Sequence, residues 1–111
     1  MRSIRPATAA AGLALAIINQ ANAQDVATIE ISAKDHRFQP AEAKAPSGKP
    51  LVLKVKNLDT EPMEFESKTL QFETVVKPGA EGLIKVKAQK PGRHSFFDDL
   101  HPNTKGTLIV E

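Results

Sequence analysis

The chain has 111 residues, with 15 lysines and arginines against 13 aspartates and glutamates, and it contains no cysteine. The absence of cysteine excludes disulfides, thiol catalysis and metal–thiolate centres of zinc or copper. The charges nearly balance and there is no Tyr or Trp. This composition does not favour a nucleic-acid-binding protein.

The first 23 residues have the pattern of a secretory signal peptide. Arg2 and Arg5 give a basic start, residues 7–18 are apolar and uncharged, and Ala21-Asn22-Ala23 ends the segment with small residues. The apolar stretch is too short to span a bilayer. We predict cleavage after Ala23 and export, which leaves residues 24–111 as one small domain that does not span the membrane.

The predicted domain reads as short strands separated by turn residues. Alternation of apolar and polar side chains predicts strands at Val26–Ser32, Leu51–Lys56, Met63–Ser67, Phe72–Lys77, Leu83–Lys87, Arg93–Phe97 and Gly106–Glu111. Turns are predicted at residues 47–50, 78–79 and 91–92, and a bend at Pro40. Seven or eight short strands without a helical period predict an all-β protein built as an antiparallel sandwich.

Residues able to bind a metal gather in two places. One is the segment PMEFE at residues 62–66, and the other is FFDDLHP at residues 96–102. Each combines apolar strand residues with carboxylates and with either a thioether or an imidazole. The sequence therefore contains a candidate metal site formed at two strand ends.

The spacing of these segments resembles the cupredoxin family. Plastocyanin-like members carry an Asn and then Pro-His at the start of one strand; this chain has Asn57 and then Pro62-Met63. Their C-terminal motif, which ends in Cys-x-x-His before a loop and a last strand, is matched by GRHSFFDDLH at residues 92–101. The resemblance covers nearly the whole predicted domain and implies a Greek-key sandwich.

The departures from that pattern decide the chemistry. Met63 stands at the family's first histidine position and Asp98 at its cysteine position, whereas His101 keeps the second histidine. Because no thiolate is present, the chain cannot be a blue-copper electron carrier. A thioether, an imidazole and carboxylates remain, and such a mixture accepts copper or iron.

Strand parity predicts how these residues are arranged. Residues two apart share a face, so Met63 should point inward while Glu64 and Glu66 point outward. Asp98 should lie on the core side at the open end of its strand. We expect Met63, Asp98 and His101 to converge at one pole of the sandwich, with Glu64 at its rim and Glu66 further out.

The other two histidines are expected to lie outside this site. His94 stands where the family has a structural tyrosine, and we expect it to be hydrogen-bonded to the backbone. His36 belongs to the first strand region, and we expect it on the surface, away from the pole.

A narrower resemblance suggests a cellular role. The segments MEFES (63–67), VVKPG (75–79) and FFDDLH (96–101) are similar to the cupredoxin-like periplasmic subunit of bacterial ferrous-iron uptake systems. The resemblance implies a periplasmic protein that binds copper or iron and works with a periplasmic iron-binding protein and an iron permease complex.

In this interpretation copper is held by Met63, Glu64, Asp98 and His101. The bound Cu(II) takes an electron from Fe(II) held nearby by carboxylates such as Glu66, which favour the harder Fe(III) product. The ligand set and the ferrous-iron oxidation are hypotheses that the resemblance suggests.

Two alternatives remain open. In the first alternative the protein is a copper or iron chaperone without redox chemistry, and in the second it is an interaction module without a metal. Met63 suits Cu(I), whereas carboxylates fit that ion poorly, so the relative affinities for Cu(I) and Cu(II) distinguish the chaperone. Hydrolase chemistry is not favoured, because no G-x-S-x-G motif is present.

Overall fold

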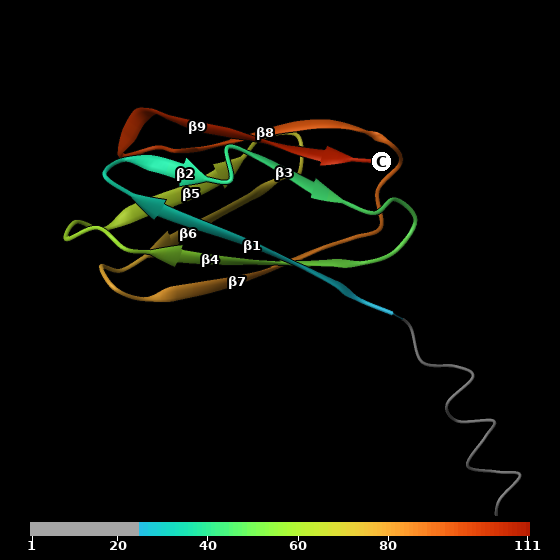
Figure 1. Ribbon diagram of the computed structural model, residues 1–111, viewed down its shortest axis with the longest axis horizontal. Helices are drawn as coiled ribbons and strands as arrows, with labels where there is room; N and C mark the ends of the chain where they lie inside the picture. The colour runs from blue at the N-terminus through green and yellow to red at the C-terminus, as the bar shows by residue number, and fades with distance from the viewer. Residues whose placement is uncertain (1–24) are drawn as a thin grey trace, which may run out of the picture.

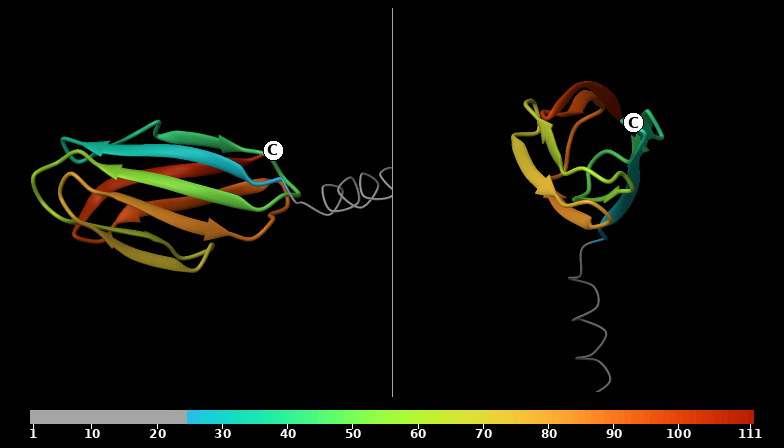
Figure 2. Two further views of the ribbon diagram at one scale, coloured as in Figure 1. Left: turned by 90° about the horizontal axis from the view of Figure 1, so that it is seen from below. Right: turned by 90° about the vertical axis from the view of Figure 1, so that its left-hand side faces the viewer.

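The computed structural model describes residues 25–111, so the predicted signal peptide at residues 1–23 lies outside the described residues. Two β-sheets pack face to face (Figures 1 and 2). Sheet A contains, in spatial order, β2 (Arg37–Gln39), β1 (Ala27–Lys34), β4 (Leu51–Asn57) and β7 (Glu81–Val86). Sheet B contains β3 (Glu42–Ala45), β9 (His101–Val110), β8 (Gly92–Asp98), β5 (Met63–Ser67) and β6 (Phe72–Val76). No helix within residues 25–111 is long and apolar enough to cross a membrane.

The predicted all-β sandwich is confirmed, with nine strands in residues 25–111 instead of seven or eight. The two additional short strands, β2 and β3, flank Pro40, where the sequence predicted a bend. The sheets are mixed and not purely antiparallel as predicted, because β1 pairs with β4 and β3 pairs with β9 in parallel. The chain leaves sheet A to form β3 in sheet B and then returns, so β4 runs in the same direction as β1.

Aromatic side chains form the centre of the core between the sheets. Phe65 and Phe96 are almost fully buried, and their ring centroids lie 5.2 Å apart. Phe38 meets both rings edge-on, at 5.6 Å from Phe65 and 5.0 Å from Phe96. Burial of each such side chain contributes about 1.5–3 kcal/mol. Phe38 thereby fixes short strand β2 over strands β5 and β8 of sheet B.

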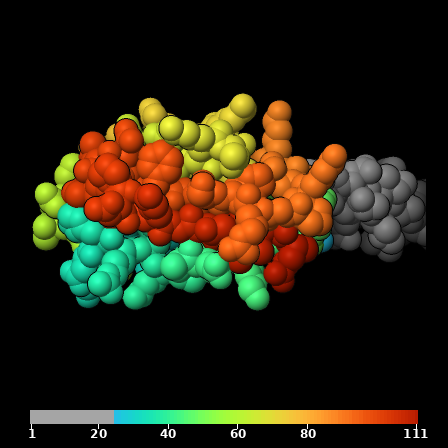
Figure 3. Space-filling model, turned by 90° about the horizontal axis from the view of Figure 1, so that it is seen from above, coloured from blue at the N-terminus to red at the C-terminus, as the bar shows by residue number. Residues whose placement is uncertain are grey.

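One end of the sandwich gathers three connections that are far apart in sequence. Because β1 and β4 are parallel, the β1–β2 turn lies beside the β4–β5 loop. The β8–β9 turn joins them, because Asp98 at the end of β8 pairs with Phe65 near the start of β5. Figure 3 shows these cyan, yellow-green and red segments together at the left end of the molecule. We call this end the histidine pole, defined by His36, Glu61, Asp98 and His101.

Candidate metal centre

Asp98 and His101 form the closest polar pair of the histidine pole. Oδ2 of Asp98 lies 2.7 Å from Nδ1 of His101. Oδ1 of Asp98 accepts the backbone N–H groups of Glu64 and Leu100, each at 3.0 Å. Since the carboxylate can only accept, Nδ1 must be the protonated nitrogen, and Nε2 of His101 is left with a lone pair in the neutral ring.

The local sequence explains this arrangement. The bond from Leu100 N–H to the Asp98 carboxylate is an Asx-type turn, which short Asp side chains favour. Asp99 and Leu100 form the turn, and β9 starts at once with His101, which pairs with Asp98 across a register shift after Phe97. Asp98 is buried, with 4% exposure, whereas the His101 side chain keeps 26%. The hydrogen bond to Asp98 raises the pKa of His101 above its usual value.

The predicted alternation of inward and outward side chains along β5 agrees with the structure, and it places the Met63 side chain in the apolar core. Met63 and Phe65 are buried, whereas Glu64 and Glu66 are half-buried on the outer face. The thioether belongs to the apolar core cluster. The Glu64 contact to Asp98 is made by its backbone N–H. The structure therefore brings Asp98 and His101 together, whereas Met63 packs in the core.

The side chains of Glu64, Glu66 and Asp99 form a separate acidic group on the outer face of sheet B. Their carboxylate oxygens lie within 4.8 Å of one another. Burial first, and then repulsion from Glu73, raises the pKa of both Glu64 and Glu66. The acidic group lies on the outer face of the sheet, whereas Asp98 is buried, so the group is separate from the Asp98–His101 pair.

Removing one charge beside this group should stabilise the metal-free protein. Glu73 is opposite Glu66 in the β5–β6 ladder. The raised pKa values mean that ionisation of Glu64 and Glu66 opposes folding, and this penalty disappears as the pH falls through those pKa values. We expect Glu73→Gln to raise Tm at about pH 7 but not at about pH 4, measured by circular dichroism. Glu30→Gln is the control, because Glu30 lies opposite Lys54 in sheet A and its removal should not raise Tm. An equal gain at both pH values would contradict the repulsion argument.

His36 and Glu61 also belong to the pole, although sequence reasoning did not select them. Nε2 of His36 lies 3.2 Å and Nε2 of His101 lies 3.5 Å from Oε1 of Glu61. The two imidazole rings meet edge to face, with centroids 4.1 Å apart. The expectation that His36 lies away from the pole is therefore wrong. A two-residue turn at Asp35-His36 was the available signal, but its position depends on the parallel pairing of β1 with β4.

Hydrogen bonds from the β4–β5 loop hold the β1–β2 turn in place. Asp35 and His36 both have positive φ, 52° and 59°, and their N–H groups donate to the Asp59 carboxylate at 2.6 and 3.0 Å. Asn57, 1% exposed, accepts the Asp59 N–H and donates to the Glu61 carbonyl. Burial alone would raise the pKa of Asp59, but the N–H donors outweigh it and leave that pKa below its usual value.

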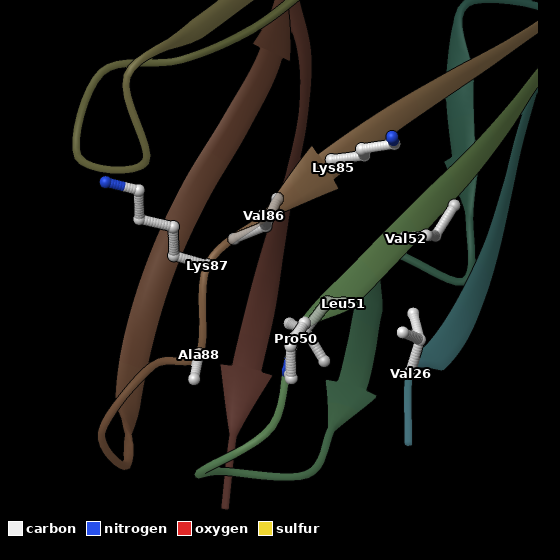
Figure 4. A pocket seen from close by; sticks show the side chains of 8 residues that line it. All are labelled: Val26, Pro50, Leu51, Val52, Lys85, Val86, Lys87 and Ala88. Atoms are coloured by element: carbon white, nitrogen blue, oxygen red, sulfur yellow. The ribbon is translucent and has the colours of Figure 1, made fainter. Parts of the chain in front are cut away.

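The remaining histidine and an apolar groove lie elsewhere. Nδ1 of His94 lies 2.9 Å from the Thr69 hydroxyl, so its hydrogen-bond partner is a side chain and not the expected backbone group. A groove of about 580 Å³ lies at the opposite end of the sandwich (Figure 4). Apolar residues such as Val26 and Val86 line it together with Lys85 and Lys87. This lining offers neither imidazole nor carboxylate to a metal.

The pole does not fit a type 1 copper site, which requires a thiolate. At the thiolate position the Asp98 carboxylate already accepts two backbone N–H groups and the His101 ring. At the first histidine position Met63 is 2% exposed within the core. The partly exposed side chains of the pole are the imidazoles of His36 and His101 and the carboxylate of Glu61. Such donors suit divalent ions of intermediate hardness.

Comparison with known proteins agrees with the architecture. An uncharacterized protein of Rickettsia prowazekii (strain Madrid E) is 33% identical over 87 residues, covering 78% of this chain and 70% of that protein. The metal-binding domain of the Cu(I)-exporting P-type ATPase CopA from Streptococcus pneumoniae D39 superposes with a TM-score of 0.65 and 17% identity, covering 81% of this chain and 99% of that domain. The blue copper protein auracyanin A from Chloroflexus aurantiacus superposes with a TM-score of 0.65 and 12% identity, covering 78% of this chain and 100% of that protein. Residues 7–110 match the model of the cupredoxin-like domain, and the chain belongs to this family.

Proposed function

We propose that the protein is an exported copper-binding protein that holds its ion at the histidine pole through Nε2 of His101. The carrying observation is the 2.7 Å contact between the buried Asp98 carboxylate and Nδ1 of His101. A carboxylate in this position fixes the ring and its tautomer, and it makes the other nitrogen a better ligand. Ligation by Met63, Glu64, Glu66 and Asp98, as the sequence suggested, stays a prediction that this proposal does not require.

Copper is the ion that we propose for this site. The similar structures named above include a Cu(I)-exporting ATPase domain and a blue copper protein. Imidazole binds Cu(II) strongly, and Cu(II) exceeds the other divalent first-row ions in affinity for most nitrogen and oxygen sites. Bound Cu(II) would supply a one-electron acceptor in an environment without thiolate.

We further propose that this copper centre serves ferrous-iron acquisition in the periplasm, together with an iron-binding protein and an iron permease. The support is the resemblance of residues 63–67, 75–79 and 96–101 to the corresponding subunits. The acidic group of Glu64, Glu66 and Asp99 offers oxygen donors on β5 and in the β8–β9 turn, and such donors favour Fe(III) over Fe(II).

Titration of the purified protein with Cu(II) tests the copper proposal. We expect one saturable site with a tetragonal electron paramagnetic resonance (EPR) signal and nitrogen splitting, because the donors include imidazole but no thiolate. His101→Ala should abolish this site. His94→Ala, which alters a histidine bonded to Thr69, is the matched control and should leave binding unchanged. Absence of saturable binding to the wild-type protein would favour the interaction module.

Addition of Fe(II) to the copper-loaded protein without oxygen tests the redox step. If Fe(II) is oxidised, each Fe(III) formed should accompany the reduction of one Cu(II), because one electron is transferred. The Cu(II) signal should therefore decrease in proportion to the Fe(II) added. An unchanged signal at saturating Fe(II) would exclude oxidation and favour the chaperone alternative.

A further inference from the structure

We propose that His36, Glu61 and His101 form a three-ligand site for a divalent transition-metal ion, with two imidazole nitrogens and one carboxylate oxygen. This inference rests on the proposed function, since it names the ligands of the same site. Two of the three residues come from segments to which the sequence pattern assigned no metal ligand. The first hairpin of the sandwich thereby becomes part of the metal centre.

The distances between the donor atoms fit a single ion. Ligands that lie about 2.0–2.2 Å from an ion such as Zn²⁺ are about 3.0–3.5 Å from one another. Oε1 of Glu61 is 3.2 Å from Nε2 of His36 and 3.5 Å from Nε2 of His101. One donor atom from each of the three residues lies within 4.8 Å of the others. A small movement of these side chains would therefore place all three around one ion.

The donor set and its exposure determine which ions it would accept. Two imidazoles and a carboxylate suit Cu(II), Zn(II) and Fe(II), whereas Cu(I) prefers sulfur. The sulfur of Met63 is in the core cluster and does not join this set. The side chains are 44% (His36), 57% (Glu61) and 26% (His101) exposed. An ion held by three such ligands would keep positions open to water or another exchangeable ligand.

Asp59 acts as the positioning residue of this site. Its carboxylate holds both left-handed residues of the β1–β2 turn, Asp35 and His36, by their N–H groups. The Thr104 hydroxyl donates to the carbonyl of His36 at 2.8 Å. The His36 backbone is thus bound from the β4–β5 loop and from β9, which holds its ring beside His101.

The decisive experiment combines EPR of the Cu(II)-loaded protein with measurement of its Cu(II) affinity, for the purified wild type and for matched variants. We expect splitting from two nitrogens in the wild type and from one in His36→Asn, with an affinity loss of about tenfold or more. Asn tolerates the left-handed conformation, so His36→Asn preserves the turn. Glu61→Gln should weaken binding but keep both nitrogens. His94→Ala should change neither quantity.

A second pair of variants tests Asp59. Asp59→Ala should weaken Cu(II) binding and reduce the contribution of the second nitrogen. Adding Asp35→Gly should restore part of the affinity, since glycine adopts positive φ without strain. Wild-type Cu(II) binding with only one nitrogen, unchanged in His36→Asn, would overturn this inference and leave the proposed function intact. Absence of saturable Cu(II) binding to the wild-type protein would instead refute the proposed function.

Discussion

Gly106→Ala is expected to destabilise the protein by about 3 kcal/mol, at the upper end of the usual cost of overpacking a core. A Cβ at this position would lie 2.4 and 2.5 Å from two ring atoms of Phe96 and 2.9 Å from the carbonyl oxygen of Ala41. Phe96 cannot move away freely, because Phe38 and Phe65 pack against its ring. The strain must therefore be relieved by displacing core side chains or β9.

Thermal denaturation measures this effect. For a domain of this size, a loss of about 3 kcal/mol lowers Tm by more than about 10 °C. Gly92→Ala is the control, because its added Cβ would have only one neighbour, at 4.0 Å. The double variant Phe96→Leu with Gly106→Ala should be more stable than the sum of the single effects predicts, since the smaller side chain leaves room. A Gly106→Ala protein as stable as Gly92→Ala would refute the packing argument.

The strands that were predicted well are those whose alternation reflects a single buried face. In β4, Leu51, Leu53 and Val55 are all buried, as their period of two requires. Short strands β2 and β3 were missed because three or four residues around a proline contain too little alternation. Parallel pairing could not be read from the sequence either, because it depends on the crossing of the chain between the sheets and not on local pattern.

The same difference between local and long-range information explains the site. Asp98 and His101 are three residues apart, so strand parity and the cupredoxin spacing were enough to predict their association. His36 and Glu61 are brought to the same end by the parallel pairing of β1 with β4, and no sequence motif predicts this pairing. Met63 was selected by its position in the cupredoxin pattern, but side-chain parity directs it into the apolar core.

Asp98→Asn is expected to lower Cu(II) affinity by about 10–100-fold while preserving the fold. The asparagine oxygen can still accept the N–H groups of Glu64 and Leu100. Its amide would donate to Nδ1 of His101, so the ring proton would move to Nε2, the nitrogen that faces Glu61. The ligand atom would then be blocked by a proton, although its position would be unchanged.

Asp98→Ala separates this effect from folding. Removal of the carboxylate leaves two backbone N–H groups without their acceptor, which should cost about 3 kcal/mol. Denaturant titration should therefore show a large loss of stability for Asp98→Ala and a small one for Asp98→Asn. Equal destabilisation by both variants would contradict the hydrogen-bond argument, and undiminished Cu(II) affinity in Asp98→Asn would refute the positioning role.

The pH dependence of metal-free stability provides an independent check on the same pair. Because Asp98 raises the pKa of His101 above 6.5, the protonated pair stabilises the fold below the unfolded-state pKa. This contribution is lost as the pH rises through the folded-state pKa. The Tm difference between the wild type and Asp98→Asn should therefore be largest at about pH 5–6 and decrease toward about pH 8. A difference that grows with pH would mean that Asp98 does not stabilise the imidazolium, and the hydrogen bond could not then be assigned the role of orienting a metal ligand.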